Sequence, residues 1–195
     1  MKLDIVFTGV GGQGIVGASD VFCEAAMLEG FDVAKAETHG MAQRGGSVVV
    51  HVRIGDQVKS PIIEMGTGDI ILSFEILEAV RCLPFLKENG IALINKQLIL
   101  PVPVIQGLVE CPSVEKLIDT AKRKTRQVYE IDGINLSRKA GNLTAVNIVL
   151  LGALSVLPEN PVSEKTLTET IAHSFKPQYT AVNLKAFQLG RESIT

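Results

Sequence analysis

A cluster of glycines near the amino terminus has a spacing that could bind an anion. Residues 9–14 read GVGGQG, which fits the pattern G-x-G-x-x-G. An apolar run precedes this stretch and a helical pattern follows it, so we expect a turn from a strand into a helix. Because glycine has no Cβ, consecutive N–H groups can face one ligand, and the helix amino terminus adds a partial positive charge. The loop therefore predicts a phosphate or pyrophosphate site formed by Gly9, Gly11, Gly12, Gln13 and Gly14.

A second polar, glycine-bearing stretch, ETHGMAQRGGS, occupies residues 37–47. Arg44 could hold a phosphate or a carboxylate with two parallel hydrogen bonds, and His39 could exchange a proton near neutral pH. Loops at the carboxyl ends of parallel strands meet at one edge of a sheet. We therefore expect His39, Arg44 and Gly45 beside the glycine loop, with His39 as a hydrogen-bonded loop residue in preference to a catalytic one. The sequence offers no specific nucleophile–base pair or carboxylate pair, so no catalytic residue is predicted.

Strand-like and helix-like segments follow one another along the chain and predict the elements that position these loops. Apolar or β-branched runs predict strands at residues 3–8, 31–36, 47–54, 69–73, 91–95 and 127–131. Helical spacing predicts helices at 15–29, 75–86 and 113–124, the second ending at Asn89-Gly90, and then only helices, at 143–157, 164–175 and 180–191. The first strand, helix and strand are expected to form a parallel pair with a right-handed crossover. On the strand at 47–54, His51 and Arg53 are expected on the less buried face.

The predicted fold class is α/β: an open, mostly parallel, Rossmann-like sheet with flanking helices and a helical carboxyl-terminal part. The length of 195 residues suits a single domain, 1–195. With 19 Lys and Arg against 21 Asp and Glu, a net charge of −2 and no Trp, the composition argues against nucleic acid as a main partner. There is no membrane-length apolar run and no signal-peptide pattern, which predicts a cytoplasmic protein without a membrane partner. The spacing of Cys23, Cys82 and Cys111 predicts reduced thiols and no metal site.

Three segments in order resemble a known family. GVGGQGIVGAS, ETHGMAQRGGSVVVHVRIG and DIILSFEILEAVRCLPFLKENGIALIN resemble the gamma-type subunit of 2-oxoacid:ferredoxin oxidoreductases, the domain III type of pyruvate:ferredoxin oxidoreductase. The last segment and the THGMAQRGG form are most similar to the beta subunit of indolepyruvate ferredoxin oxidoreductase. The resemblance implies a subunit, inactive alone, of an enzyme that converts a 2-oxoacid such as indolepyruvate to an acyl-CoA and reduces ferredoxin.

The resemblance also implies cofactors and partners. Thiamine diphosphate and 4Fe–4S clusters belong to partner subunits of the same enzyme, and ferredoxin is a partner only indirectly. In relatives the glycine loop is associated with the nucleotide end of coenzyme A. Carried over, the positions are Gly11, Gly12, Gln13 and Gly14, with Arg44 as a phosphate partner. Asp20, where some relatives have a basic residue, would weaken the attraction for phosphate.

Two alternatives stay open. The glycine spacing alone would also fit a stand-alone oxidoreductase that binds a nucleotide or a flavin, with Glu37 as the candidate for the acidic residue that holds a ribose. Alternatively, the chain would be a purely structural docking subunit, whose glycines merely allow tight turns against a partner.

Overall fold

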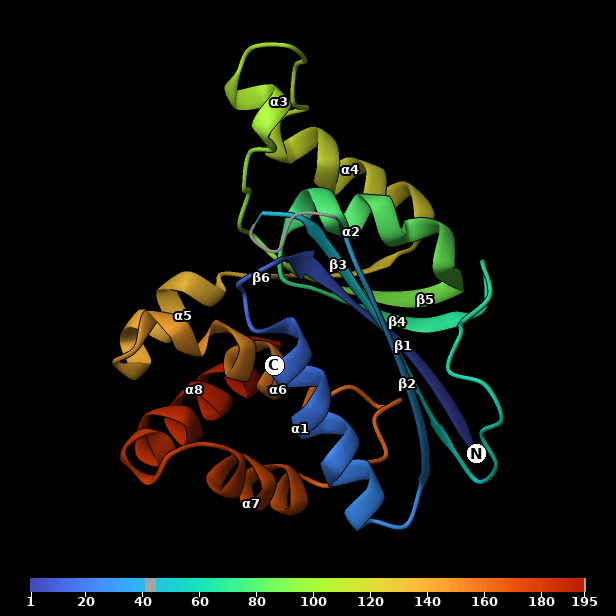
Figure 1. Ribbon diagram of the computed structural model, residues 1–195, viewed down its shortest axis with the longest axis vertical. Coiled ribbons are helices and arrows are strands. Elements are labelled where there is room, and N and C mark those ends of the chain that lie inside the picture. The colour runs from blue at the N-terminus through green and yellow to red at the C-terminus, as the bar shows by residue number, and fades with distance from the viewer. Residues whose placement is uncertain (41–44, 195) are drawn as a thin grey trace.

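One sheet runs through the centre of the molecule (Figure 1). The computed structural model describes residues 1–40 and 45–194, and in this part of the chain six strands pair in the order β2-β3-β1-β4-β5-β6. They are β1 (Lys2–Val10), β2 (Asp32–His39), β3 (Ser47–Gly55), β4 (Gly68–Ser73), β5 (Leu86–Asn95) and β6 (Gln127–Ile131). Strands β1, β4, β5 and β6 are parallel, whereas β3 is antiparallel to both neighbours. The predicted open, mostly parallel sheet is confirmed.

Helices cover both faces of this sheet (Figure 1). One face carries α2 (Ile76–Cys82), η1 (Leu83–Phe85) and α4 (Val114–Lys124). The other carries α1 (Ile15–Leu28), α5 (Gly133–Ala140), η2 (Leu143–Ala145), α6 (Val146–Ser155), α7 (Glu164–Ser174), η3 (Pro177–Tyr179) and α8 (Thr180–Glu192). The helical carboxyl-terminal part is therefore confirmed, and α5 is an additional helix that the sequence did not predict.

The side chains of β1 alternate between two apolar cores. Ile5 and Phe7 pack with α1 and the carboxyl-terminal helices, while Val6 packs with α2 and α4. A strand that is buried on both faces has a continuous apolar run in place of an alternating one. This is why the run at residues 3–8 predicted the strand correctly.

The parallel pair predicted for the first strand–helix–strand unit is wrong, because β3 lies between β1 and β2. Strands β1 and β2 run in the same direction, but each pairs with β3. Strands β2 and β3 follow one another along the chain and pair antiparallel, an arrangement that needs no crossover helix. The strand β3 pairs on both sides, which satisfies its backbone hydrogen bonds. The carboxyl ends of β1 and β2 still lie at the same edge of the sheet.

The second predicted helix is shorter than expected. The helix α2 ends at Cys82, and Pro84 lies in the 3₁₀ turn η1 that follows. Proline lacks the N–H that a continuing helix would need. The strand β5 begins at Leu86, so Asn89 and Gly90, predicted to end the helix, lie inside this strand. Asn89 has a φ of 58°, which marks an irregularity in β5. The sequence pattern at this position had been interpreted as the end of a helix.

Of the two polar residues of β3, His51 is more enclosed than predicted, whereas Arg53 is half-buried on the less buried face, as expected. His51 is 6% exposed, its Nδ1 accepts a hydrogen bond from the N–H of Ile63 at 3.3 Å, and its ring meets Phe85 edge-on. Arg53 donates to both carboxylate oxygens of the fully buried Asp4 and to the carbonyl of Ser60. The expectation of a less buried face fails for His51, because the segment at 56–66 covers it.

Helices α6 and α8 cross with their backbones in contact. A Cβ built on Gly152 would lie 2.0 Å from the carbonyl oxygen of Phe187, and one built on Gly190 would lie 1.9 Å from that of Val149. No side chain fits at either position. These two glycines therefore fix the separation of the two helices.

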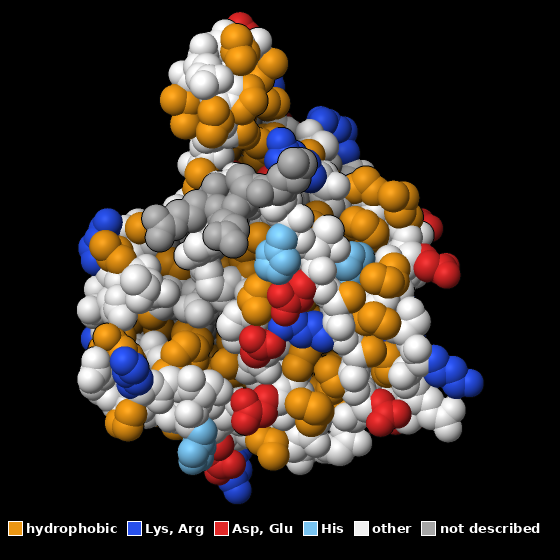
Figure 2. Space-filling view, in the orientation of Figure 1, with side chains coloured by type: hydrophobic (Ala, Val, Ile, Leu, Met, Phe, Trp, Pro, Cys, Tyr) orange, Lys and Arg blue, Asp and Glu red, His pale blue; other side chains and the backbone are white. Residues whose placement is uncertain are grey.

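The segment around α3 (Val102–Ile105) stands away from the sheet, at the top of Figure 1. Between residues 97 and 109 the chain carries no charged side chain. Its exposed apolar side chains gather over this projection (Figure 2), and they are Leu100, Val102, Ile105, Leu108 and Val109. Exposed apolar patches of this kind mark surfaces that contact other molecules.

Candidate functional site

The glycine loop joins β1 to α1 and requires glycine for conformational reasons. Gly12 has a φ of 103° and Gly14 a φ of 79°, in the left-handed region that L side chains rarely adopt. Gly9 is required for packing, because a Cβ there would lie 2.7–2.9 Å from the side chains of three neighbours. The turn itself thus explains these three glycines, and their contact with a ligand stays a prediction.

Several backbone N–H groups at the start of α1 are without partners. Within residues 1–40 and 45–194, nothing accepts a hydrogen bond from the N–H of Gly12, Gly14, Ile15, Val16 or Gly17. Gly14 occupies the capping position and has no side chain that could accept from them. Unpaired N–H groups at a helix amino terminus favour an anion, and the helix dipole acts in the same direction. This end of α1 can therefore donate hydrogen bonds to a phosphate.

The side chain of Gln13 holds the loop instead of projecting from it. Its Oε1 accepts from the N–H of Val10 at 2.8 Å. Its Nε2 donates to the carbonyl of Phe74 at 2.9 Å and to Oε1 of Gln97 at 3.1 Å. Both ends of the amide are therefore engaged within the protein. Gln13 is better described as a positioning residue for the glycine loop than as a ligand-binding side chain.

The two loops predicted to converge lie together at one edge of the sheet. The register places His39 opposite Val48 and Val48 opposite Gly9, and the N–H of Gly11 donates to the carbonyl of Gly46 at 2.9 Å. A cleft of about 690 Å³ opens between them, lined by Gly11, Gly12, Gly14, Ile15, Val16, His39, Gly40 and Val48. Gly45 is exposed with a φ of 79°. The predicted phosphate partner Arg44 lies outside the described residues.

A network of ion pairs and hydrogen bonds links the charged side chains near this cleft. Lys35 forms ion pairs with Asp20 and Glu37, and Glu37 also pairs with His39 at 3.1 Å. The hydrogen bond from Lys35 lowers the pKa of Glu37, although partial burial opposes this. Burial also opposes the charge of Lys35, but its hydrogen bonds to both carboxylates outweigh burial and raise its pKa. The expected repulsion of phosphate by Asp20 is therefore partly offset by Lys35, which Asp20 shares with Glu37.

Glu37 is poorly placed for the nucleotide alternative. It lies on β2, which is two strands away from β1 in the sheet. Neighbouring strands are about 4.8 Å apart, so β2 is displaced by about 10 Å from the glycine-loop strand. A dinucleotide-binding unit holds its ribose with an acidic residue at the end of the adjacent strand. The insertion of β3 removes that arrangement.

The opposite side of the loop contains residues that the sequence did not single out as site residues. A Cβ on Gly14 would lie 3.0 Å from Nδ2 of Asn147, and Asn95 donates to the carbonyl of Phe74 beside Gln13. A second cavity of about 380 Å³ lies here, lined by Gly12, Gln13, Gly14, Gln97, Ile134, Leu143, Thr144 and Val146. The one available signal was Asn147, a polar residue within the apolar run of α6.

Two of the three cysteines, Cys23 and Cys82, are buried, and Cys111 is half-buried. Burial raises the pKa of the Cys23 thiol to about 12 and that of Cys82 to about 11, so neither is a reactive thiolate near neutral pH. Among the residues that the structure describes, no three His, Cys, Asp or Glu side chains are grouped closely enough to hold a metal ion. None of the helices within the same residues is long and apolar enough to cross a membrane.

The sheet and its glycine loop define a Rossmann-like α/β domain. The sequence profile of the family described as "Pyruvate ferredoxin/flavodoxin oxidoreductase" matches residues 4–193. The chain is 39% identical over 190 residues to indolepyruvate oxidoreductase subunit IorB of Archaeoglobus fulgidus, covering 97% of this chain and 94% of the relative. With the same coverage it is 41% identical to the IorB subunit of Pyrococcus horikoshii. The chain therefore belongs to this family, and it is a gamma-type subunit of a 2-oxoacid:ferredoxin oxidoreductase.

Solved structures agree with the fold. The gamma subunit of a keto/oxoacid ferredoxin oxidoreductase from Geobacter sulfurreducens has a TM-score of 0.72 at 24% identity, and the match covers 98% of both chains. A 2-oxoglutarate:ferredoxin oxidoreductase from Magnetococcus marinus, with 2-oxoglutarate, coenzyme A and succinyl-CoA bound, has a TM-score of 0.75 at 23% identity. That match covers 99% of this chain and 31% of the other, so the same fold there is part of a longer polypeptide.

Proposed function

We propose that this chain is the non-catalytic subunit of an indolepyruvate-type oxidoreductase and that its glycine loop holds phosphate groups of coenzyme A. The indolepyruvate assignment is supported by the full-length similarity to the IorB subunits. The coenzyme A assignment is supported by the bound coenzyme A in the Magnetococcus marinus enzyme, which shares the fold.

The observation that carries the proposal is the set of unpaired N–H groups on residues that line the cleft. Gly12, Gly14, Ile15 and Val16 line this cleft, and their N–H groups have no acceptor among the described residues. A phosphate would receive hydrogen bonds from this turn and would be stabilised by the helix dipole. Gln13 keeps the loop in place through its three hydrogen bonds, and Arg44 remains the predicted cationic partner.

The remaining chemistry belongs to partner subunits. Thiamine diphosphate and 4Fe–4S clusters on those subunits would supply decarboxylation and electron transfer to ferredoxin, as in the family of 2-oxoacid:ferredoxin oxidoreductases. Among the described residues of this chain, no metal-ligating cluster is present that would hold a 4Fe–4S group. The role of this chain is to bind and orient coenzyme A in a cytoplasmic complex, and it is not expected to be active alone.

A matched pair of variants tests the loop. Gly12 and Gly30 both have positive φ, 103° and 87°, and a Cβ at either position meets nothing within 4 Å. Gly12→Leu places a side chain at the cleft, whereas Gly30→Leu places one after the far end of α1. The leucine keeps its N–H, but its side chain would hold a phosphate away from this turn. Losing one charge-assisted hydrogen bond costs about 1.5 kcal/mol, so we expect the KM for coenzyme A of the assembled enzyme to rise about tenfold in Gly12→Leu only. Equal KM values in both variants would remove the loop from the site and favour the docking alternative.

The exposed α3 segment supports docking to the thiamine- and cluster-bearing subunit. Ile105 is 70% exposed, and the neighbouring Gln106 lies on the same short turn. Ile105→Lys should abolish co-purification with the larger subunit, because it places a charge in an apolar contact. Gln106→Lys adds the same charge beside it and serves as the control. Recovery of the wild-type chain alone from its native source, without a larger subunit, would contradict the subunit assignment.

A further inference from the structure

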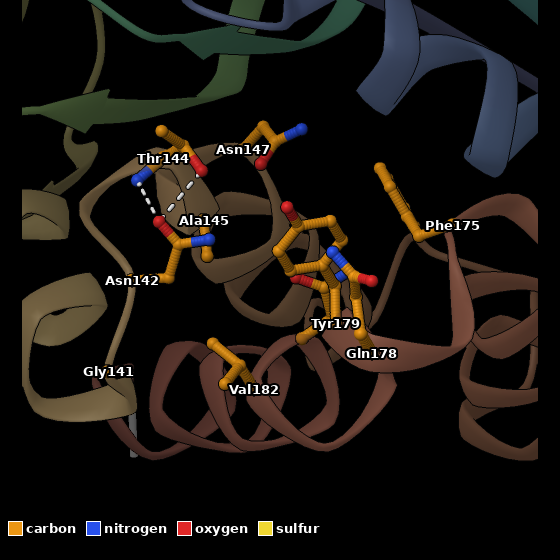
Figure 3. Close-up of a pocket in the computed structure, with 10 residues that line it drawn as sticks. Gly141, Asn142, Thr144, Ala145, Asn147, Phe175, Gln178, Tyr179 and Val182 are labelled. Atoms are coloured by element: carbon orange, nitrogen blue, oxygen red, sulfur yellow. Dashed lines mark hydrogen bonds between the residues drawn. The ribbon is translucent and has the colours of Figure 1, made fainter.

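A third cavity lies in the carboxyl-terminal helical layer, away from β2 and β3. It has a volume of about 710 Å³ and is lined by Gly141, Asn142, Thr144, Ala145, Asn147, Phe175, Gln178, Tyr179, Val182 and Asn183. Figure 3 shows Asn142 and Thr144 on one side, with Phe175, Gln178 and Tyr179 facing them across the opening. None of these ten side chains is charged. The lining therefore favours a neutral ligand group over a charged one.

Two enclosed amides in the lining, those of Asn147 and Asn183, have unused hydrogen-bonding capacity. Asn183 is 5% exposed, yet within the part of the chain that the structure describes its amide has no hydrogen-bond partner. Asn147 is 9% exposed, and its Nδ2 likewise has no partner there, whereas Gln178 and Tyr179 are exposed residues at the rim whose side chains are open to solvent. Among these described residues no fully enclosed side-chain N or O atom lacks a partner, so the Asn183 amide must retain some access, and the cavity that it lines provides it. Enclosed amides that lack a partner favour a ligand with donors and acceptors of its own.

The shape and chemistry of the lining fit a planar, neutral, polar ring. Asparagine and glutamine amides match the adjacent donor and acceptor of adenine. An exposed aromatic ring offers a stacking surface for a base, and Tyr179 is 42% exposed at the rim. Apolar contact with the ring face would come from Phe175 and Val182.

The cavity lies close to the glycine loop, because Asn147, which lines it, is 3.0 Å from a Cβ built on Gly14. The 380 Å³ cavity beside the loop shares Thr144 with this one, and it shares Gly12 and Gly14 with the cleft. We propose that the cavity between η2, η3 and α8 binds the adenine base of a nucleotide whose phosphates lie at the glycine loop. The adenine source that this inference favours is coenzyme A, and in that respect it rests on the proposed function. A free adenine nucleotide has the same chemistry.

Three probes and two variants test this assignment by calorimetry on the full chain and on the assembled enzyme. The probes are coenzyme A, ADP and 4′-phosphopantetheine, the last of which lacks the base. Tyr179→Ala removes the stacking ring, and Tyr179→Phe retains it. Base stacking is worth about 1–3 kcal/mol, so Tyr179→Ala should weaken coenzyme A binding about tenfold or more. Tyr179→Phe should stay within about twofold of the wild type, because the ring that stacks is unchanged.

Binding of 4′-phosphopantetheine should be unchanged in both variants, since it cannot contact the cavity through a base. The control is Leu28→Ala, at a 68% exposed position at the far end of α1, which should leave all three affinities unchanged. A matching loss for ADP would support the site and show that free nucleotides enter it. Loss for coenzyme A without ADP binding would support the site with coenzyme A as the sole source.

Failure of this inference can be told apart from failure of the proposed function. If Gly12→Leu weakens coenzyme A binding and Tyr179→Ala does not, the loop assignment stands and the base site is refuted. Equal losses for coenzyme A and 4′-phosphopantetheine in Tyr179→Ala also refute it, because the effect would not act through the base. Protection of residues 141–147 from hydrogen exchange in the complex without coenzyme A would assign the cavity to a partner segment instead. Absence of coenzyme A and ADP binding by the chain and by the assembled enzyme overturns both.

Discussion

Replacing Gln13 tests whether its amide holds the glycine loop in place. Gln13→Ala removes three hydrogen bonds, to Val10, Phe74 and Gln97. Each such bond contributes about 0.5–1.5 kcal/mol net, and the site is half-buried, so we expect a loss of about 2–3 kcal/mol in the free energy of unfolding. For a chain of this size, this corresponds to a fall in Tm of about 4–12 °C. Gln97→Ala removes one of the three bonds, together with the long 3.4 Å bond that Asn95 donates to Gln97, and should lose about 1 kcal/mol.

Urea unfolding and amide hydrogen exchange measure this effect at two levels. The N–H of Val10 donates to Gln13, so its exchange should accelerate in Gln13→Ala before the rest of β1 responds. The control is Gln106→Ala, which replaces a glutamine that makes no side-chain hydrogen bond within the described residues. If Gln13→Ala is no less stable than Gln106→Ala, or if Val10 exchanges at the wild-type rate, the role assigned to this amide is wrong.

Two further predictions concern pH and the geometry of the loop. Burial first, and then the nearby Arg53, lower the pKa of His51 below its ordinary value of 6.5, so the folded protein resists protonation there. The stability that follows is complete above pH 6.5 and is lost as the pH falls through the lowered pKa. His51→Asn keeps an acceptor for Ile63 and should flatten the pH dependence of urea unfolding between pH 8 and pH 5; an unchanged slope would contradict this. Gly14→Ala should lose about 1 kcal/mol more stability than Gly30→Ala, because both have positive φ but only the former brings a Cβ to 3.0 Å from Asn147. Equal losses would show that Asn147 moves aside freely.

Local signals in the sequence predicted local structure well. The apolar run before the glycines, the helical spacing at 113–124 and the helical spacing after Asn142 each depend on neighbours within a few residues, and all were confirmed. The position of β3 was not predictable in this way. Its β-branched residues indicate a strand, but its partners on either side depend on a pairing between distant segments. The same applies to the face of His51, which is covered by a segment that no periodicity assigns to it.

The features of the candidate site also separate into those that local sequence predicts and those that depend on distant residues. The glycine loop was located by its G-x-G-x-x-G spacing, and the proximity of His39 to the loop followed from the rule that strand ends meet at one edge. The actual function of the Gln13 side chain did not, because its partner Gln97 is 84 residues away. Asn147 and Asn183 were missed as site residues for the same reason, since their approach depends on how α6 and α8 pack. Short-range patterns thus located the loop, and long-range packing determined what surrounds it.

The backbone contact between α6 and α8 has a consequence for the rate at which a ligand could enter between them. Asn147 and Asn183 project from two helices that Gly152 and Gly190 hold at a fixed separation. The backbones of α6 and α8 do not have to reorganise when the base of a ligand binds, so little backbone entropy is lost on association. The association rate would then be set by diffusion and orientation. Differences in affinity among ligands would arise from their dissociation rates.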